Sequence, residues 1–255
     1  MLVALKELGE ISTGNTPSKK NIEYYDSDDI CFVKPDIISD GEISIINSSN
    51  EYISEKARTK ARIVQGNSIF VTCIGTIGKV GIAAKGNYAF NQQINAITPN
   101  DRVIPKYLAY AIFCSKAKLS AIANAPVVPI INKTQFGDFE INIEPNIDKQ
   151  KQIIIILDKL QSIITHRKQQ LAKLDELVKA RFVEMFGEVG NDPKGFGMKL
   201  LNDVCEINPK KTDDKRLRSG LKVSFVPMPA VSETGDIDAT EIRTYDEVNQ
   251  GLPIL

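Results

Sequence analysis

Reactive and metal-binding side chains are scarce in this chain of 255 residues, which contains no tryptophan and one histidine, His166. The four cysteines lie far apart and form no CxxC pair: Cys31, Cys73, Cys114 and Cys205. Such spacing argues against a disulfide framework and a zinc site, and it suits buried thiols in a reducing compartment. Because the histidine falls inside a predicted long helix, triad and histidine-metal chemistry lack their reagents.

Long apolar runs are absent as well. The longest purely aliphatic run covers residues 153–157, whereas a membrane helix needs about 18 apolar residues or more. No cationic start precedes an apolar segment, as it would in a signal peptide. We therefore expect no membrane partner and a cytoplasmic location. With 42% hydrophobic and 25% charged residues, the composition is that of a soluble globular protein.

Two segments resemble catalytic motifs but lack residues that the motifs require. Residues 75–81 (GTIGKVG) suggest a phosphate-binding loop, yet Walker A spacing needs a glycine where Cys73 stands and a Ser or Thr where Val80 stands. Pro35-Asp36 suggests a nuclease, but no acid-x-Lys pair follows at a suitable spacing. The sequence therefore predicts a protein without catalytic activity of its own.

The strongest positive signal is a heptad pattern over residues 149–186. An ordinary amphipathic helix usually ends after about 8–20 residues, whereas this pattern continues for roughly five heptads. A coiled coil is therefore favoured over a helix buried in its own domain, and the charged seam residues would select the partner and register. The ten seam positions alternate at intervals of four and three residues: Ile153, Leu157, Leu160, Ile164, Arg167, Leu171, Leu174, Val178, Arg181 and Met185.

Similar strings on both sides of this helix indicate a duplication. At an offset of 193, residues 8–11 (LGEI) align with 201–204 (LNDV), and the string that begins at Phe32-Val33 aligns with the one at Phe225-Val226. The second match continues through residues 38–43 with one insertion. Each match is weak alone, but their common order favours a repeat.

The predicted layout follows from the repeat and the helix. A first domain occupies residues 1–148, a spacer helix 149–186, a glycine-rich linker 187–199, and a second, truncated copy 200–255. Short strands at residues 30–33, 68–72 and 79–84 and a helical pattern over 104–123 predict an α+β domain with mixed strands and helices.

Charge is distributed unevenly along the first domain. Residues 1–55 carry four basic and eleven acidic residues, whereas residues 56–137 carry eleven basic residues and one acidic residue, Asp101. A long stretch with so few carboxylates is typical of a surface that faces phosphates. The alternative is that acidic residues of the first segment fold against the basic segment and neutralise it. Asn91-Gln92-Gln93 could read adenine edges, but turn capping is the favoured interpretation.

Two strings carry a resemblance to a known family: residues 74–79 (IGTIGK) with 90–96 (FNQQINA), and residues 171–179 (LAKLDELVK) with 182–187 (FVEMFG). Over essentially its whole length the chain resembles the specificity subunits of type I restriction-modification systems. In that family, two target recognition domains are separated by long helices that pack as an antiparallel coiled coil. The glycine and glutamine strings belong to the framework, and variable loops contact the bases.

The resemblance implies a subunit that binds double-stranded DNA, with one domain reading half of a bipartite site and the helix setting the gap. Methyltransferase and restriction/translocase subunits would be its partners and would hold S-adenosylmethionine, ATP and Mg²⁺, so that no cofactor is expected on this chain. The expected DNA contacts are basic residues around the framework: Lys19, Lys20, Lys34, Arg58, Lys60, Arg62, Lys79, Lys85 and Lys133.

The incomplete second copy departs from the family pattern and leaves three alternatives open. The chain pairs with itself through the spacer helix, it is completed by a separately encoded half-subunit, or it is an inactive cassette. A protein-interaction module remains the alternative from another class, and salt-insensitive binding would identify it. A methyltransferase is the weakest alternative, because Asn208-Pro209-Lys210-Lys211 lacks the Asn-Pro-Pro-aromatic pattern.

Overall fold

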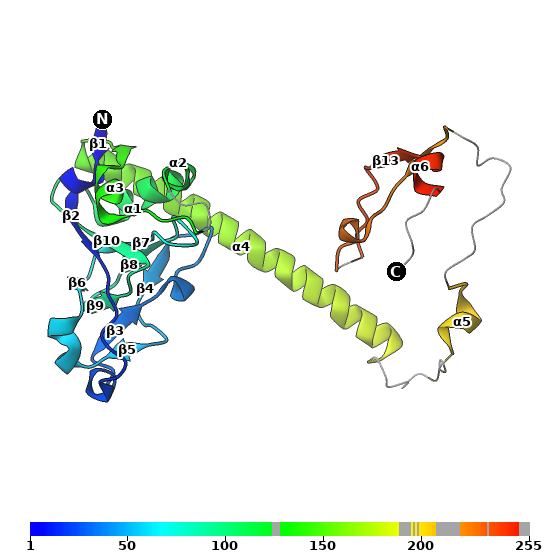
Figure 1. The fold of residues 1–255 in the computed structure, drawn as a ribbon, viewed down its shortest axis with the longest axis horizontal. Coiled ribbons are helices and arrows are strands. Elements are labelled where there is room, and N and C mark those ends of the chain that lie inside the picture. Colours follow the sequence, from blue (N-terminus) through cyan, green and yellow to red (C-terminus); the bar gives the residue numbers. More distant parts are fainter. Residues whose placement is uncertain are drawn as a thin grey trace. The chain divides into compact units, whose positions relative to one another are not determined.

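The computed structural model describes residues 1–123, 128–188, 195, 197, 199–207, 220–233 and 235–249, and the chain divides into two compact units, Met1–Ala180 and Arg181–Leu255 (Figure 1). Most of the predicted linker, the motif at residues 208–211 and the end of the second copy, 250–255, lie outside the described residues.

The first unit is built on two main sheets. In the five-stranded sheet only β4 and β8 are parallel, and in the four-stranded sheet only β3 and β9 are. A small antiparallel pair, β1 (Leu2–Ala4) and β11 (Glu140–Asn142), joins the two ends of the domain. The larger sheet has the order β2 (Gly9–Thr13), β10 (Ile94–Pro99), β7 (Ile69–Thr72), β8 (Val80–Ala83) and β4 (Ser44–Ile46). The smaller sheet has the order β5 (Tyr52–Ile53), β3 (Ile30–Val33), β9 (Asn87–Phe90) and β6 (Ile63–Gln65).

Short helices complete the unit. They are the 3-10 helices η1 (Leu5–Glu7), η2 (Ile22–Tyr24), η3 (Pro35–Ile37) and η4 (Glu55–Lys60), and the α-helices α1 (Pro105–Cys114), α2 (Lys116–Ala121) and α3 (Lys133–Asp138). The helical pattern over 104–123 is thus two helices, because Ser115 leaves the helical conformation and its hydroxyl donates to the carbonyl of Ala111 (2.8 Å). The predicted strands and the α+β class are confirmed.

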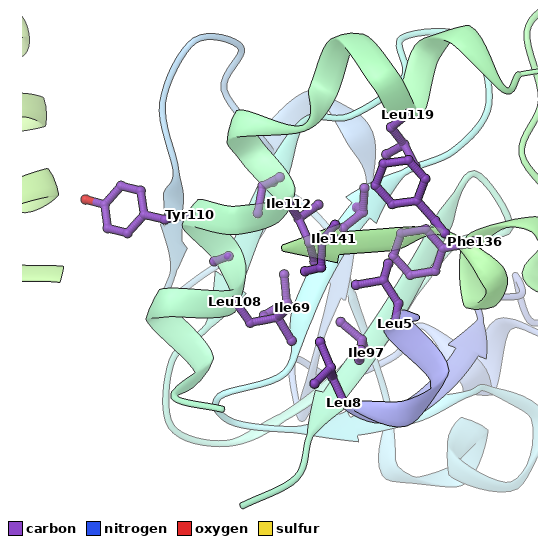
Figure 2. Close-up of a cluster of buried hydrophobic side chains, with 14 of the residues drawn as sticks. Leu5, Leu8, Ile69, Ile97, Leu108, Tyr110, Ile112, Leu119, Phe136 and Ile141 are labelled. Carbon is purple, nitrogen blue, oxygen red and sulfur yellow. The ribbon is translucent and has the colours of Figure 1, made fainter. Parts of the chain in front are cut away.

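Alternating side chains of the larger sheet face two different apolar clusters, which explains why its inner strands β7 and β8 are buried on both sides. Ile69 and Val71 contribute to a cluster with α1, α2 and α3, part of which Figure 2 shows. Phe70, between them, faces the smaller sheet and lies 5.4 Å from the ring of Phe90. A third cluster around Phe32 fills the space between the smaller sheet and η4. The unit therefore consists of helices, two sheets and an outer layer of 3-10 turns.

The spacer helix is present as α4 (Ile147–Phe186), so a long helix after the sheet domain is confirmed. It begins two residues earlier than predicted, where the Asn146 side chain accepts hydrogen bonds from the backbone N–H groups of Asp148 (2.9 Å) and Lys149 (3.1 Å). All of its residues after Thr165 are exposed. No helix in the described part of the chain is long and apolar enough to cross a membrane.

The described elements of the second unit follow the same order as five elements in the first part of the first unit. Strands β12 and β13 pair antiparallel, as β3 and β5 do. Its elements are α5 (Leu201–Val204), β12 (Lys222–Ser224), η5 (Met228–Ala230), β13 (Ile242–Thr244) and α6 (Tyr245–Asn249). These elements correspond in order to η1, β3, η3, β5 and η4.

The correspondence extends to backbone geometry, at the predicted offset of 193 for Phe32 and Ile38 and at an offset of 190 for Glu51. Ile38 after η3 has φ −100° and ψ 112°, and Val231 after η5 has φ −104° and ψ 116°. The N–H of Phe32 donates to the carbonyl of Glu51 (3.0 Å), and the N–H of Phe225 donates to that of Glu241 (2.8 Å). These shared details support the duplication.

One part of the predicted alignment is wrong in register. Gly9 begins strand β2, whereas Leu201–Val204, aligned with it from sequence, forms a helical turn like Leu5–Glu7. Aligning residues 5–11 (LKELGEI) with 201–207 (LNDVCEI), at an offset of 196, matches turn with turn. The error arose because a short apolar string matches in more than one register.

Candidate nucleic-acid interface

The amides of Asn91 and Gln93 hold a turn of the framework. Asn91 is 7% exposed, and its side chain donates to the Gln93 side chain (2.9 Å) and accepts from the Gln93 backbone N–H (3.1 Å). Gln92 is exposed and accepts a hydrogen bond from the Thr16 hydroxyl (2.9 Å). The capping interpretation is therefore confirmed for Asn91, whose side chain is buried and bonds both to the backbone and to the side chain of Gln93.

The glycine segment at residues 75–81 is a tight connection between β7 and β8. Gly75 and Gly78 have φ values of 76° and 80°, which favour glycine. The N–H of Gly78 donates to the carbonyl of Thr72 (2.9 Å), and the N–H of Lys79 donates to the Thr72 hydroxyl (3.0 Å). Because a strand follows and these N–H groups bond within the loop, the segment is framework.

Acidic residues neutralise part of the basic segment, as the alternative interpretation expected. Lys56 pairs with Asp26 (3.0 Å), and this hydrogen bond raises the pKa of Lys56. Lys116 pairs with Asp40, and the hydrogen bond lowers the pKa of Asp40. Five of the eleven basic residues at 56–137 are ion-paired, all but Lys106 with acidic residues of the first segment: Lys56, Arg58, Arg102, Lys106 and Lys116.

Four of the predicted DNA-contacting residues also have partners. Glu51 pairs with both Lys34 and Lys19, the latter at 3.9 Å. Arg58 pairs with Glu55 (3.0 Å), and the ammonium of Lys79 donates to the carbonyl of Pro35 (3.3 Å). The other five have no ion pair among the described residues: Lys20, Lys60, Arg62, Lys85 and Lys133.

Lys60 is the last residue of η4, and Arg62 lies just before β6. Both backbones are held by one side chain. The Asn15 side chain donates to the carbonyl of Lys60 (2.7 Å) and accepts from the backbone N–H of Arg62 (2.8 Å). The N–H of Asn15 in turn donates to the carbonyl of Phe90 (2.9 Å). Because these bonds use only backbone groups of Lys60 and Arg62, both cationic side chains stay exposed.

A glycine allows this close approach of two segments. A Cβ atom on Gly14 would lie 2.2 Å from the carbonyl oxygen of Asn91 and 2.4 Å from that of Phe90, so no other residue fits without movement of the backbone. Gly14 thereby places Asn15 beside η4.

Two adjoining hollows form a polar groove along β2, η4 and β6. Their volumes are about 500 and 410 Å³, and they share Ala61 and Arg62. The remaining residues of the groove are Thr13, Gly14, Asn15, Thr59 and Lys60 in the larger hollow, and Glu10, Ser12, Ile63, Val64, Gln65 and Thr98 in the smaller. Lys20, Lys85 and Lys133 do not line it. The sequence-based prediction did not include the polar residues that line this groove. The string of small polar residues at 12–16 could have indicated them.

Reactive groups elsewhere show no catalytic arrangement within the described residues. His166 is exposed on α4, and the same part of the chain contains no cluster of His, Cys, Asp and Glu able to hold a metal ion. Burial raises the pKa of Cys31 to about 11 and that of Cys73 to about 12. Cys114 and Cys205 are exposed, so the expectation of four buried thiols is wrong for these two, which stand at the C-terminal ends of α1 and α5.

The heptad seam divides into two parts. Ile153 and Leu157 are half-buried and pack against the first unit's own core. From Leu160 onward the seam is exposed, including Leu171 (63%) and Val178 (71%). Arg167 and Arg181 bond within the helix, to Gln170 (2.7 Å) and Glu184 (2.6 Å). Pairing of the exposed part with another helix stays a prediction.

Comparison with known proteins identifies related chains. A family described as "Type I restriction modification DNA specificity domain" matches residues 1–176. The MjaIX specificity subunit of Methanocaldococcus jannaschii is 29% identical over 80% of this chain and 51% of its own length. The EcoR124I/EcoR124II specificity subunit of Escherichia coli is 29% identical over 69% and 45%. The chain thus spans about half the length of these relatives.

Solved structures show the same fold. The HsdS subunit of Thermoanaerobacter tengcongensis superimposes with a TM-score of 0.54 at 17% identity, over 73% of this chain and 44% of that one. A chain from a type I R-M system, described for complex assembly and conformational transition, gives a TM-score of 0.57 at 17% identity, over 71% and 43%.

Proposed function

Because the chain belongs to the type I restriction modification DNA specificity domain family, we propose that it recognises DNA sequence on behalf of partner subunits. Its first domain reads one half of a bipartite site in double-stranded DNA. Partner methyltransferase and nuclease/translocase subunits carry out the reactions and hold S-adenosylmethionine, ATP and Mg²⁺. The proposed place of action is the cytoplasm, where bacterial and archaeal DNA lies.

The DNA contact is supported by two cations in the polar groove that form no ion pair with any residue the structure describes. Lys60 and Arg62 stand two residues apart on one wall, and their backbones are fixed by Asn15. Phosphates attract such cations and release counterions when they bind. A basic surface with fixed backbone positions can hold a DNA strand in register.

The rest of the groove offers groups for base edges. Guanidinium groups pair with guanine, side-chain amides with adenine, and carboxylates accept from the amino group of cytosine. Arg62, Gln65 and Glu10 supply one group of each kind in the smaller hollow. We assign base reading to this hollow and phosphate contact to Lys60 in the larger one.

The exposed seam of α4 supports the proposed spacer role. Apolar seam residues such as Leu171, Leu174 and Val178 are more than half exposed, and a stripe of this kind is normally covered by a partner helix. Leu177 lies beside them and widens the stripe. We propose that a second copy of α4, or the spacer helix of a complementary half-subunit, covers it.

The experiment that tests the DNA contact measures affinity for a random-sequence duplex by fluorescence anisotropy at several salt concentrations. On a random-sequence duplex Arg62 meets no preferred base, so we expect it to contact phosphate as Lys60 does, and replacing both with alanine should reduce the slope of log K against log salt by about 2. The matched control replaces Lys118 and Lys159, two exposed lysines outside the groove, and should leave most of the slope.

Two results would contradict the assignment. An unchanged slope in the groove variant, with the protein folded, would place the phosphate contacts elsewhere. Binding of the unaltered chain that barely responds to salt would favour a protein-interaction module, because docking of apolar helices does not release counterions.

A further inference from the structure

The buried side chain of Gln150 connects the N-terminal end of α4 to the recognition domain through hydrogen bonds. Gln150 has no exposed surface, and its side-chain oxygen accepts a hydrogen bond from the N–H of Ile104 (2.9 Å). Its side-chain nitrogen donates to the carbonyls of Glu144 (2.7 Å) and Arg102 (3.3 Å). One side chain thus joins the first turn of α4, the start of α1 and the strand connection before the helix.

A second connection lies two turns further along α4. Asp158 accepts hydrogen bonds from the ammonium of Lys106 (2.7 Å) and the hydroxyl of Tyr110 (2.7 Å), both on α1. Figure 2 shows the Tyr110 ring turned away from the apolar cluster of the domain. Burial raises the pKa of Tyr110, and the hydrogen bond to Asp158 adds to this effect. We call Gln150, Asp158 and their partners the helix joint.

Contacts between α4 and the first unit end part-way along the helix. Leu157, Leu160 and Ile164 line a hollow of about 200 Å³ beside Tyr110. The residues of α4 after Lys168 are all exposed. The first unit therefore contacts α4 from its start to Lys168, and the remainder of the helix is exposed.

We infer that Gln150 and Asp158 are positioning residues that fix the angle between the recognition domain and α4, and through it the gap between the two half-sites. This inference rests on the proposed function. Apolar contacts alone allow side chains to repack and helices to slide, whereas hydrogen bonds to three fixed backbone groups admit one geometry.

The length of α4 makes the angle matter. Its 40 residues extend about 60 Å at 1.5 Å per residue, so a tilt of about 10° at the joint moves the far end by about 10 Å. That displacement equals roughly three base pairs at about 3.4 Å each. A flexible joint would therefore allow several spacings between the two half-sites, whereas a rigid joint allows one.

The first test measures rigidity without any need for activity. Spin labels are placed at Lys118→Cys on α2 and Lys179→Cys on α4, in a background with Cys114→Ser and Cys205→Ser, because both of these thiols are exposed. Excess unlabelled protein suppresses distances between two chains. Pulsed electron paramagnetic resonance measures the distance between the two labels. The parent should give one narrow distance distribution, and Gln150→Leu and Asp158→Asn should give a broadened or shifted one. Asp175→Asn, which removes an exposed carboxylate from the same helix, should match the parent.

The second test maps methylated adenines in cells that co-express each variant with the cognate methyltransferase subunit. The parent should modify a motif with one gap length, and Gln150→Leu should add motifs with the same half-sites and other gaps. Asp158→Asn, the milder change, should do so to a lesser degree and remains informative if Gln150→Leu does not fold.

Two outcomes overturn the inference. Narrow, unshifted distances in both variants show that the joint does not depend on these residues. Broadened distances with an unchanged gap show that the joint does not set the gap. A parent complex that methylates no bipartite motif contradicts the proposed function instead, and the distances then still decide whether Gln150 and Asp158 hold the helix.

Discussion

The same short stretch of fold occurs in both units but is buried only in the first. The turns Pro35–Ile37 and Met228–Ala230 have matching backbones and follow matching strands. The aligned apolar residues differ in exposure: Val33, Ile38 and Ile43 are 0%, 0% and 8% exposed, whereas Val226, Val231 and Ile237 are 39%, 48% and 62% exposed.

The difference lies in what covers the two stretches. In the first unit, Val33 and Ile38 pack against Phe70, Phe90 and Ile94 from later strands. No described residue of the second unit takes the place of these strands. Local sequence is thus enough for a hairpin and a 3-10 turn, while a core requires strands that are distant in sequence.

Paired alanine substitutions give the largest expected contrast. Phe32→Ala removes a fully buried ring and should lower the free energy of unfolding of the first unit by about 3–5 kcal/mol. Phe225→Ala removes a half-exposed ring that stacks with Arg243 and should change stability by about 1 kcal/mol or less. Urea unfolding followed by circular dichroism measures both. Equal losses would mean that the second copy has a core of its own.

A residue exchange between the aligned positions Gly9 and Cys205 gives the next largest effect. A Cβ atom on Gly9 would lie 2.3 Å from the carbonyl oxygen of Thr98 on β10, so Gly9→Cys should destabilise the first unit by about 1–3 kcal/mol. Cys205→Gly alters an exposed position and should stay within about 0.5 kcal/mol. Thermal unfolding of the two variants and the parent measures both effects. A Gly9→Cys protein as stable as the parent would contradict the close contact between β2 and β10.

The smallest expected effect is the pH dependence of the helix joint, which only the first unit possesses among the described residues. Burial would raise the pKa of Asp158, but hydrogen bonds from Lys106 and Tyr110 outweigh it and hold the pKa below its ordinary 3.8. The carboxylate therefore stabilises the fold fully above that value, and its contribution is lost as the pH falls through the lowered pKa.

The measurement compares melting temperatures of the parent and Asp158→Asn across this range. The parent should be the more stable protein at neutral pH, by less than about 1 kcal/mol because the pair is partly exposed, and the two curves should converge in acid. A difference that grows as the pH falls would contradict the assigned direction.

Patterns that depend on neighbours in sequence were predictable. The heptad repeat indicated α4, and β-branched runs indicated β3, β7 and β8, because each reflects a period of the element itself. The ion pairs were not predictable, since Lys56 and Asp26 or Lys116 and Asp40 meet only through the fold. Charge counts alone therefore overstated the basic surface.

The sequence did not lead us to predict the roles of Asn15 and Gln150, for different reasons. Asn15 lies in a loop, and its bonds to Lys60 and Arg62 cross 45 and 47 positions in sequence. Gln150 did leave a signal, because it stands three residues before Ile153 and thus continues the heptad seam with a polar side chain. A polar residue on an apolar stripe indicates either a buried hydrogen-bond network or a break in the stripe.

Mapping of modified adenines decides whether this chain recognises DNA for a methyltransferase. The chain is co-expressed with its cognate methyltransferase subunit in a host without adenine methylation, and the genome is sequenced with detection of modified bases. We expect a recurrent bipartite motif, which disappears or changes when groove residues such as Arg62 and Gln65 are replaced. A genome without a modified motif, with the folded complex present in the cells, would contradict the claim that this chain recognises DNA for a methyltransferase.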